Sequence, residues 1–136
     1  MPRRWLFKTE PGEYSYDELE REKKAVWDGV ANNLALKNLR EVRLGDQILI
    51  YHSGEERSIV GIAEAITDAY PDPQENDEKL VVVNLKPKRR FSAPLTLAEI
   101  REIDELKDFD LVRLPRLSVM PIRPEQWEIL SDRLNH

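Results

Sequence analysis

The sequence has no cysteine, and it contains little histidine and glycine. Without cysteine, the chain has no disulfide, no thiolate nucleophile and no cysteine-ligated zinc. The two histidines, His52 and His136, show no metal-ligand spacing. The five glycines lie singly along the chain, which argues against a glycine-rich phosphate loop. We therefore expect neither a metal nor another cofactor.

Long hydrophobic runs are also missing. The longest apolar runs, residues 48–51 and 80–83, have four residues each. A membrane-spanning helix needs about 20 apolar residues, and a secretory signal needs an apolar stretch of about 7–15. The sequence therefore predicts a soluble, intracellular protein, which we assign to the cytoplasm, with no membrane partner.

An excess of positive charge is absent as well, since the net charge is -5 and the pI is near 5.2. A protein that wraps nucleic acid through its phosphates needs a broadly basic face. Any one basic cluster is explained by a solvated surface, and a phosphate site is expected only where two clusters meet in space. The basic residues form three clusters: Arg3, Arg4 and Lys8; Lys86, Lys88, Arg89 and Arg90; and Arg113, Arg116 and Arg123.

What the chain does contain is typical of one globular domain spanning residues 1–136. Hydrophobic residues make up 40% and charged residues 35%, a balance that supports a core with a well-solvated surface. Two capping boxes, Ser15 with Glu18 and Thr96 with Glu99, mark helix starts. Strands are expected at residues 5–9, 47–52, 58–69, 79–91 and 117–123, and helices at 15–22, 32–42, 97–103 and 124–134. This mixed order favours an α+β or barrel architecture over a parallel doubly wound sheet.

The most informative segment is residues 26–33, where Trp27 stands beside Asp28 and Gly29 at a turn. Turns at strand ends are where binding pockets are built. Trp27 is a candidate platform for stacking a base, or a core residue like most tryptophans. Asn32 offers a donor and an acceptor to a base edge, or it caps the following helix.

Three further groups of polar residues are candidates for chemistry. Tyr51, His52 and Ser53 stand together at a strand end, but no nucleophile-elbow pattern surrounds any serine, so hydrolase chemistry is weakly supported. Arg116 and Ser118 bracket the start of the last strand and suit a phosphate or a base edge. Turn and capping duties account for the acids Glu10, Asp28 and Asp46 without catalysis.

Eight short segments, taken in order over nearly the whole chain, resemble the EVE domain family of the PUA-like superfamily. They are WLFKTEP at 5–11, YS at 14–15, WDGV at 27–30, GD at 45–46, YHS at 51–53, VGIA at 60–63, YPDP at 70–73 and RLSV at 116–119. The resemblance implies a PUA-like mixed β-barrel with helices inserted between strands, related to the YTH domains. It also implies a non-catalytic module that recognises methylated or hydroxymethylated cytosine, or a modified RNA base. RNA and DNA both stay open as partners.

By matching positions, the resemblance places two sets of residues around the base. Trp27 aligns with a cage tryptophan of the YTH relatives. The implied base pocket consists of Thr9, Glu10, Trp27, Asn32, Tyr51, His52, Ser53 and Ser118, with Lys8 and Arg116 on the phosphate. One departure stands out, because Ala31 and Asn33 occupy positions where the family commonly has arginine and tyrosine.

Three functions follow from these patterns as hypotheses. The leading one is a reader module in which an unpaired base meets Trp27 while nearby cations hold the phosphate. The second is a nucleic-acid or nucleotide hydrolase that uses His52 as its base. The third is a protein-interaction domain, which predicts a closed surface near Trp27 and a sizeable apolar patch elsewhere.

Overall fold

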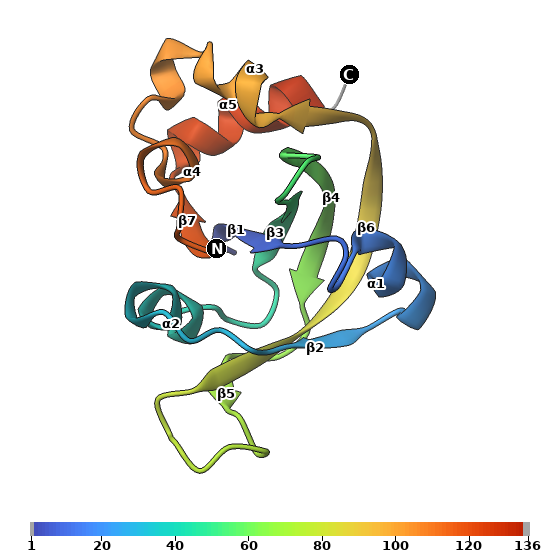
Figure 1. Ribbon diagram of the computed structural model, residues 1–136, viewed down its shortest axis with the longest axis vertical. Helices are drawn as coiled ribbons and strands as arrows, with labels where there is room; N and C mark the ends of the chain where they lie inside the picture. Colours follow the sequence, from blue (N-terminus) through green and yellow to red (C-terminus); the bar gives the residue numbers. More distant parts are fainter. Residues whose placement is uncertain (1, 135–136) are drawn as a thin grey trace.

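The computed structural model describes residues 2–134, and it contains a curled mixed β-sheet with helices packed around it (Figure 1). His136 lies outside the described residues. The strands are β1 (Arg4–Thr9), β2 (Ala25–Trp27), β3 (Gln47–His52), β4 (Ser58–Ala65), β5 (Tyr70–Pro71), β6 (Val81–Thr96) and β7 (Val119–Ile122). The helices are α1 (Tyr16–Glu22), α2 (Asn33–Arg40), α3 (Leu97–Arg101), α4 (Asp110–Arg113) and α5 (Pro124–Leu134), with a 3₁₀ turn, η1, at Asp104–Leu106.

The strand order is β2-β6-β4-β3-β1-β7, with β5 paired to β6. Strands β1 and β3 run parallel, and every other pair is antiparallel. Three strands separate β1 from β2 in this order, yet the rings of Phe7 and Trp27 lie only 5.5 Å apart. The sheet must therefore curl back on itself, and the predicted α+β class with a mixed barrel is confirmed.

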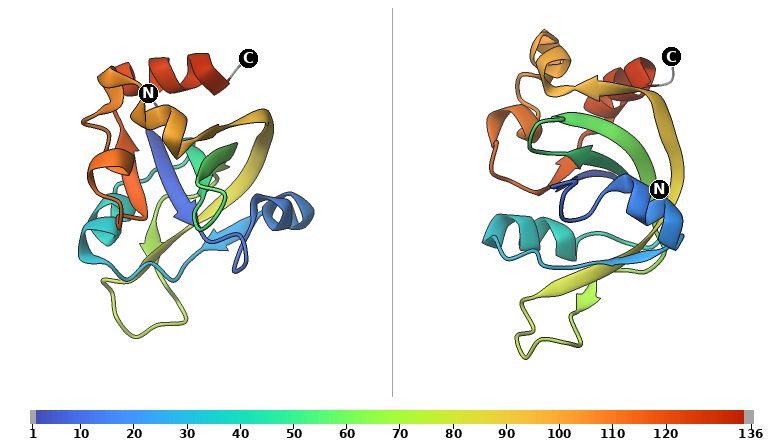
Figure 2. Two further views of the ribbon diagram at one scale, coloured as in Figure 1. Left: turned by 45° about the horizontal axis from the view of Figure 1, so that its top comes forward. Right: turned by 45° about the vertical axis from the view of Figure 1, so that its right-hand side comes forward.

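The core fills the inside of this curl, and helices cover much of the outside. Every residue of β3 except Gln47 is buried, because one face of the strand meets the barrel interior and the other is covered. Helix α2 packs against β7 and β6, while α1 packs against β6 (Figures 1 and 2). Helices α3, α4 and α5 gather at one end of the barrel (Figure 2).

The predicted helix starts are confirmed by their caps. Ser15 and Thr96 each accept a hydrogen bond from the backbone N–H three residues on, and the returning glutamate completes both capping boxes. Asn32 caps α2 through its Oδ1, which accepts from the N–H of Ala35 at 3.0 Å. Pro124 opens α5, where its missing N–H leaves no donor unsatisfied.

Several predicted boundaries were wrong. Strand β4 ends at Ala65 instead of residue 69, because the N–H of Asn84 in β6 donates to the Thr67 hydroxyl and not to the β4 backbone, and Ala69 N–H donates to Val42. Strand β6 runs on from 91 to Thr96, pairing its last residues with the start of β4 across register shifts. Strands β2 and β5, the turn η1 and helix α4 were not predicted, since each has four residues or fewer.

Among residues 2–134, no helix has the length and apolar character that crossing a membrane requires.

Candidate functional site

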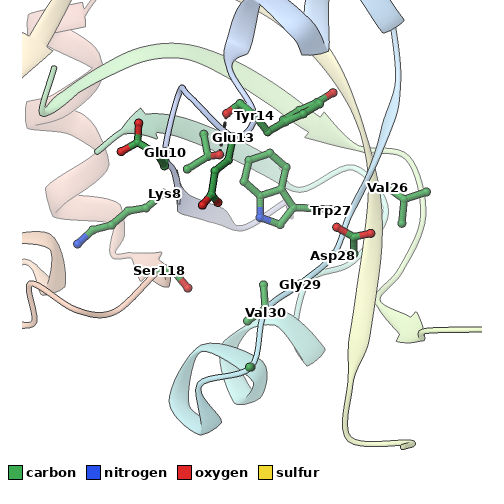
Figure 3. A pocket seen from close by; sticks show the side chains of 12 residues that line it. Lys8, Glu10, Glu13, Tyr14, Val26, Trp27, Asp28, Gly29, Val30 and Ser118 are labelled. Atoms are coloured by element: carbon green, nitrogen blue, oxygen red, sulfur yellow. Dashed lines mark hydrogen bonds between the residues drawn. The ribbon is translucent and has the colours of Figure 1, made fainter. Parts of the chain in front are cut away.

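An open cavity of about 500 Å³ lies where the curled sheet brings the ends of β1 and β2 together (Figure 3). Its volume falls within the range of small-ligand sites. Four segments contribute to its wall: the end of β1, the turn before α1, the end of β2 with the chain that follows it, and the residue before β7. The lining residues are Lys8, Thr9, Glu10, Glu13, Tyr14, Val26, Trp27, Asp28, Gly29, Val30, Ala31 and Ser118.

Trp27 forms part of this wall and is also part of the core. Its side chain packs against Phe7 at 5.5 Å between ring centroids and meets the edge of Tyr14 at 6.1 Å. Only 8% of Trp27 is exposed. One part of the indole therefore packs into the core while another borders the cavity, and the role of Trp27 as a stacking platform stays a prediction.

The indole N–H of Trp27 points into the cavity (Figure 3) and has no hydrogen-bond partner among the described residues. Trp5 provides a contrast, since its indole N–H donates to the buried carboxylate of Asp46 at 2.9 Å. An indole nitrogen is a donor only. Trp27 thus presents an unused donor to whatever occupies the cavity.

Lys8 and Thr9 stand at the end of β1, and each side chain already has one contact. The Lys8 ammonium donates to the carbonyl oxygen of Pro115 at 2.7 Å and lies 5.8 Å from the centre of the Tyr51 ring. Burial lowers the pKa of Lys8. The Thr9 hydroxyl donates to the carbonyl of Tyr14 at 2.7 Å, which fixes the turn between β1 and α1 against the strand.

Negative charge exceeds positive charge around the cavity. The wall carries three carboxylates, Glu10, Glu13 and Asp28, against the single ammonium of Lys8. One Glu10 oxygen accepts from Gly12 N–H at 3.1 Å, whereas the carboxylates of Glu13 and Asp28 have no partner among the described residues. The cavity interior therefore favours a neutral or cationic group with hydrogen-bond donors over a phosphate.

Glu13 and Tyr14 were missed as site residues by sequence reasoning. Both sit in a turn whose geometry comes from two backbone bonds, since the carbonyl of Glu10 accepts from Glu13 N–H and from Tyr14 N–H at 2.9 Å each. The Tyr14 hydroxyl donates to Glu22 at 2.5 Å. Burial, then this bond and the charge of Glu22, raises the pKa of Tyr14. The only sequence signal was the proximity of these residues to Thr9 and Glu10.

Of the predicted base-pocket residues, Thr9, Glu10, Trp27 and Ser118 line the cavity, together with Lys8. Tyr51, His52 and Ser53 do not. They lie at the end of β3, the strand next to β1, where His52 pairs with Thr9 in the parallel register. Ser53 donates through both its N–H and its hydroxyl to the carbonyl of Thr9, at 2.9 and 3.3 Å.

His52 is 5% exposed and has a structural environment. Its Nε2 accepts from the backbone N–H of Tyr16 at 3.0 Å, and its Nδ1 lies 3.0 Å from a carboxylate oxygen of Glu56. Both ring nitrogens are therefore engaged, and neither faces the cavity. This geometry does not support His52 as the general base of a hydrolase, which must reach a nucleophile at about 2.6–3.2 Å.

Asn32 and Arg116 border a second, shallower depression of about 330 Å³. In the chain, these two residues lie close to Ala31 and Ser118, which line the first cavity. The Asn32 side chain is occupied as the cap of α2, so it does not reach a base in the first cavity. Arg116 is exposed and has no ion pair to another described residue. Lys8 of the first basic cluster contacts the carbonyl of Pro115, the residue that precedes Arg116 of the third cluster.

The basic residues of β6, which make up the second basic cluster, do not form a phosphate site like the one expected at Lys8 and Arg116. Arg90 pairs with Asp17 and with Glu20, the latter at 2.8 Å. Lys86 and Lys88 both face Glu64, at 3.6 and 3.3 Å. These acids neutralise most of the charge of the second cluster.

Metal-ligating residues are not grouped in the part of the chain from 2 to 134, where no cluster of three or more histidine, aspartate or glutamate side chains is arranged to hold an ion. Asp46, for which the sequence predicted a turn or capping role, is buried and accepts from Arg3 N–H, Arg43 N–H and the Trp5 indole. It therefore serves the fold.

Comparison with solved structures shows the same fold in proteins of distant organisms. Rpa0253 from Rhodopseudomonas palustris has 36% identity to this chain, with a TM-score of 0.92 over 98% of this chain and 93% of that protein. Human THYN1, solved in complex with DNA that contains 5-methylcytosine, has 26% identity and a TM-score of 0.90, over 98% of both chains. The PUA-like barrel expected from the sequence is confirmed.

Comparison of sequences gives the same assignment. Thymocyte nuclear protein 1 of Mus musculus is 28% identical over 93% of this chain and 71% of that protein. The family model of the EVE domain matches residues 3–133, which is nearly the whole chain. This protein therefore belongs to the EVE domain family.

Proposed function

We propose that this protein is a non-catalytic nucleic-acid-binding module that takes one modified base, with methylated cytosine as the leading candidate, into the cavity beside Trp27. The observation that carries the proposal is the cavity itself. It is open, its volume of about 500 Å³ suits a small ligand, and a nearly buried tryptophan borders it with an unpaired N–H. A base extruded from a strand fits such a site, because it needs an aromatic wall and polar partners for its edge.

The comparisons support this proposal through a relative with the same fold. Human THYN1 is solved with DNA that contains 5-methylcytosine, and this chain is similar to it over 98% of its length. At 26% identity the fold is shared while many side chains differ. For this reason the base, its modification and the choice of DNA or RNA are proposals for this chain.

The phosphate belongs outside the cavity in this proposal. Three carboxylates on the wall oppose a phosphate inside. Lys8 contacts the carbonyl of Pro115, which precedes Arg116 in the chain, and we place both cations at the rim. Arg116 is exposed and has no acidic partner among the described residues. A strand that places one base inside can therefore lay the adjacent phosphate against these two cations.

A methyl group on the base has apolar surface to meet. Val26, Val30 and Ala31 line the wall around Trp27. Burying one methyl-sized group contributes about 0.8 kcal/mol, which corresponds to about fourfold in affinity. We therefore expect a modest preference for the methylated base over the plain one.

The test is a titration of matched oligonucleotides, RNA and DNA, with and without modified cytosine or adenine, against the wild type and Trp27→Ala. Loss of the indole should weaken binding by about 5- to 150-fold, since base–aromatic contacts contribute about 1–3 kcal/mol. Equal affinity of the two proteins for every oligonucleotide would refute the proposal. Circular dichroism must accompany the titration, because truncating a buried tryptophan costs about 3–5 kcal/mol of stability.

The two rival functions have less support from the geometry. The hydrolase hypothesis needs a free His52, and both nitrogens of that ring are engaged. The interaction-domain hypothesis predicts a closed surface near Trp27, where the structure has an open cavity. Large exposed apolar side chains among residues 2–134 are Val26, Leu34 and Leu44, and they come from three different segments.

A further inference from the structure

We infer that the carboxylate of Glu13 makes the cavity selective for a base that presents an exocyclic amine, so that cytosine and its 5-methyl form are bound in preference to thymine and uracil. This inference rests on the proposed function and names the residue that reads the base edge. It concerns a different part of the base from the methyl group, which meets the apolar wall.

Glu13 is placed for this role by the turn between β1 and α1. Its backbone N–H donates to the carbonyl of Glu10 at 2.9 Å, which holds the turn in position. In Figure 3 the Glu13 side chain extends toward the middle of the cavity, on the side to which the Trp27 nitrogen points. The carboxylate makes no hydrogen bond or ion pair with another residue between 2 and 134.

A second observation independently points to a ligand at the same place. Trp27 is more than nine-tenths buried, and yet its indole N–H is unpaired and directed into the cavity. The nitrogen itself borders the open cavity and is not sealed off, since Arg4 Nε is the one fully buried, unpaired side-chain polar atom among residues 2–134, so a ligand or solvent in the cavity can satisfy the indole N–H. The cavity thus offers one fixed donor, from Trp27, and one acceptor, from Glu13, to the same occupant.

The chemistry of a carboxylate decides which base fits. An ionised carboxylate accepts hydrogen bonds and cannot donate them. Cytosine carries the N4 amine, which donates, whereas thymine carries the O4 oxygen at the equivalent position. A thymine would therefore place a carbonyl oxygen against the Glu13 carboxylate, leaving both acceptors unpaired and repelling each other.

The other two acids on the wall are less suited to this role. Glu10 already accepts from Gly12 N–H, and the Asp28 side chain lies on the other side of the Trp27 ring from Glu13 in Figure 3. The Lys8 ammonium is directed to Pro115 and does not neutralise Glu13. An amine on the ligand is therefore the natural partner for the Glu13 carboxylate.

The experiment compares two single-stranded oligonucleotides that differ at one position, 5-methylcytosine in one and thymine in the other, by fluorescence anisotropy. Both bases carry the same 5-methyl group, so the comparison isolates the polar edge. The wild type should prefer 5-methylcytosine by about 5- to 150-fold, the range for a base-edge contact. Glu13→Gln should reduce the preference to within about threefold, because an amide presents either a donor or an acceptor.

The control is Glu128→Gln, which makes the same charge change at an exposed position on α5 outside the cavity. It should keep the wild-type preference. An unchanged preference in Glu13→Gln, or a wild type that binds both oligonucleotides equally, overturns the inference. If the inference about Glu13 fails in this way but Trp27→Ala still weakens binding, the proposed function remains supported. If Trp27→Ala has no effect either, both fail together.

Discussion

At the scale of single residues, Trp27 combines two tasks that are usually separate. Its ring packs against Phe7 and Tyr14 in the core, while its N–H faces the cavity. The core contacts fix the ring, so the donor is held in position before a ligand arrives. Preorganisation of this kind lowers the entropy cost of binding.

The first prediction separates the N–H of Trp27 from its ring. Trp27→Phe retains an aromatic ring beside Phe7 and Tyr14 but removes the donor, so we expect oligonucleotide binding to weaken by about 2- to 13-fold, from the loss of about 0.5–1.5 kcal/mol. Isothermal titration calorimetry measures this change. Binding equal to that of the wild type would mean that the indole acts through its surface alone.

Some of the residues predicted for the site line the cavity and others do not, for a physical reason. Lys8, Thr9, Glu10 and Trp27 line the cavity because they stand at strand ends beside turns. His52 also stands at a strand end, but its strand, β3, is paired with β1 and contributes no residue to the cavity wall. Which side of a strand end is open depends on strand pairing, and one sequence does not reveal that pairing. The binding roles of all these residues stay predictions.

At the scale of elements, β4 and α1 approach each other so closely that glycine is required at position 61. A Cβ added to Gly61 would lie 2.5 Å from Cζ of Tyr16. The Tyr16 ring is fully buried, and its hydroxyl donates to the carbonyl of Ile62 at 2.7 Å. The helix is thereby anchored to the strand through one ring.

The second prediction follows from this contact. Gly61→Ala should lower the free energy of unfolding by about 1–3 kcal/mol through overpacking, as measured by urea denaturation. Gly12→Ala is the matched control, because its added Cβ meets nothing closer than 3.4 Å and should leave stability nearly unchanged. Equal stability of the two variants would contradict the packing argument.

The third prediction concerns alkaline pH. Burial raises the pKa of Tyr16 to about 12 from its ordinary value of 10.0. The unfolded chain therefore loses this proton first, so stability is complete below about pH 10 and declines as pH rises toward 12. Tyr16→Phe should reduce that decline in urea midpoints measured from pH 9 to 12. Because burial also raises the pKa of Tyr14 and Tyr51, part of the slope should persist. An identical slope in the variant would refute this account.

Helix starts with a capping box were predictable from sequence, and so were both ends of β3, but the end of β4 was not. A capping box such as Ser15 with Glu18 is complete within four residues, so its signal is local. The end of β4 depends instead on distant partners, since the N–H of Asn84 donates to the Thr67 side chain and Ala69 N–H donates to Val42. Such long-range competition leaves no local trace in the sequence.

At the scale of the whole molecule, the net charge of -5 disfavours binding to phosphates over a broad surface. We therefore expect most of the binding energy to come from the cavity. The second basic cluster is largely paired with acids, since Lys86 and Lys88 face Glu64 and Arg90 faces Asp17 and Glu20. Few phosphate contacts imply a weak dependence on salt. The sequence predicted the mixed barrel, but the cavity depends on the curl that joins β1 to β2, and the spacing of Phe7 and Trp27 in the chain gives no hint of that contact.

The fourth prediction alters the charge at the cavity wall. Ala31→Arg adds one cation on the cavity wall. If the new side chain reaches a phosphate, the slope of log affinity against log salt should steepen by about 0.7 for a single strand. Ala98→Arg makes the same charge change at an exposed position of α3 and serves as the control. A slope that changes equally in both variants would indicate a non-specific effect.

The most direct measurement of the central claim is the indole N–H region of a ¹H–¹⁵N NMR spectrum, recorded during titration with an oligonucleotide that contains one 5-methylcytosine. Trp27→Phe assigns the signal, and Trp5, whose N–H is bonded to Asp46, is the internal reference. We predict that the Trp27 signal moves while that of Trp5 stays, and that an oligonucleotide with unmodified cytosine at the same position needs about fourfold higher concentration for the same movement. Saturable binding with an unmoved Trp27 signal would contradict the account.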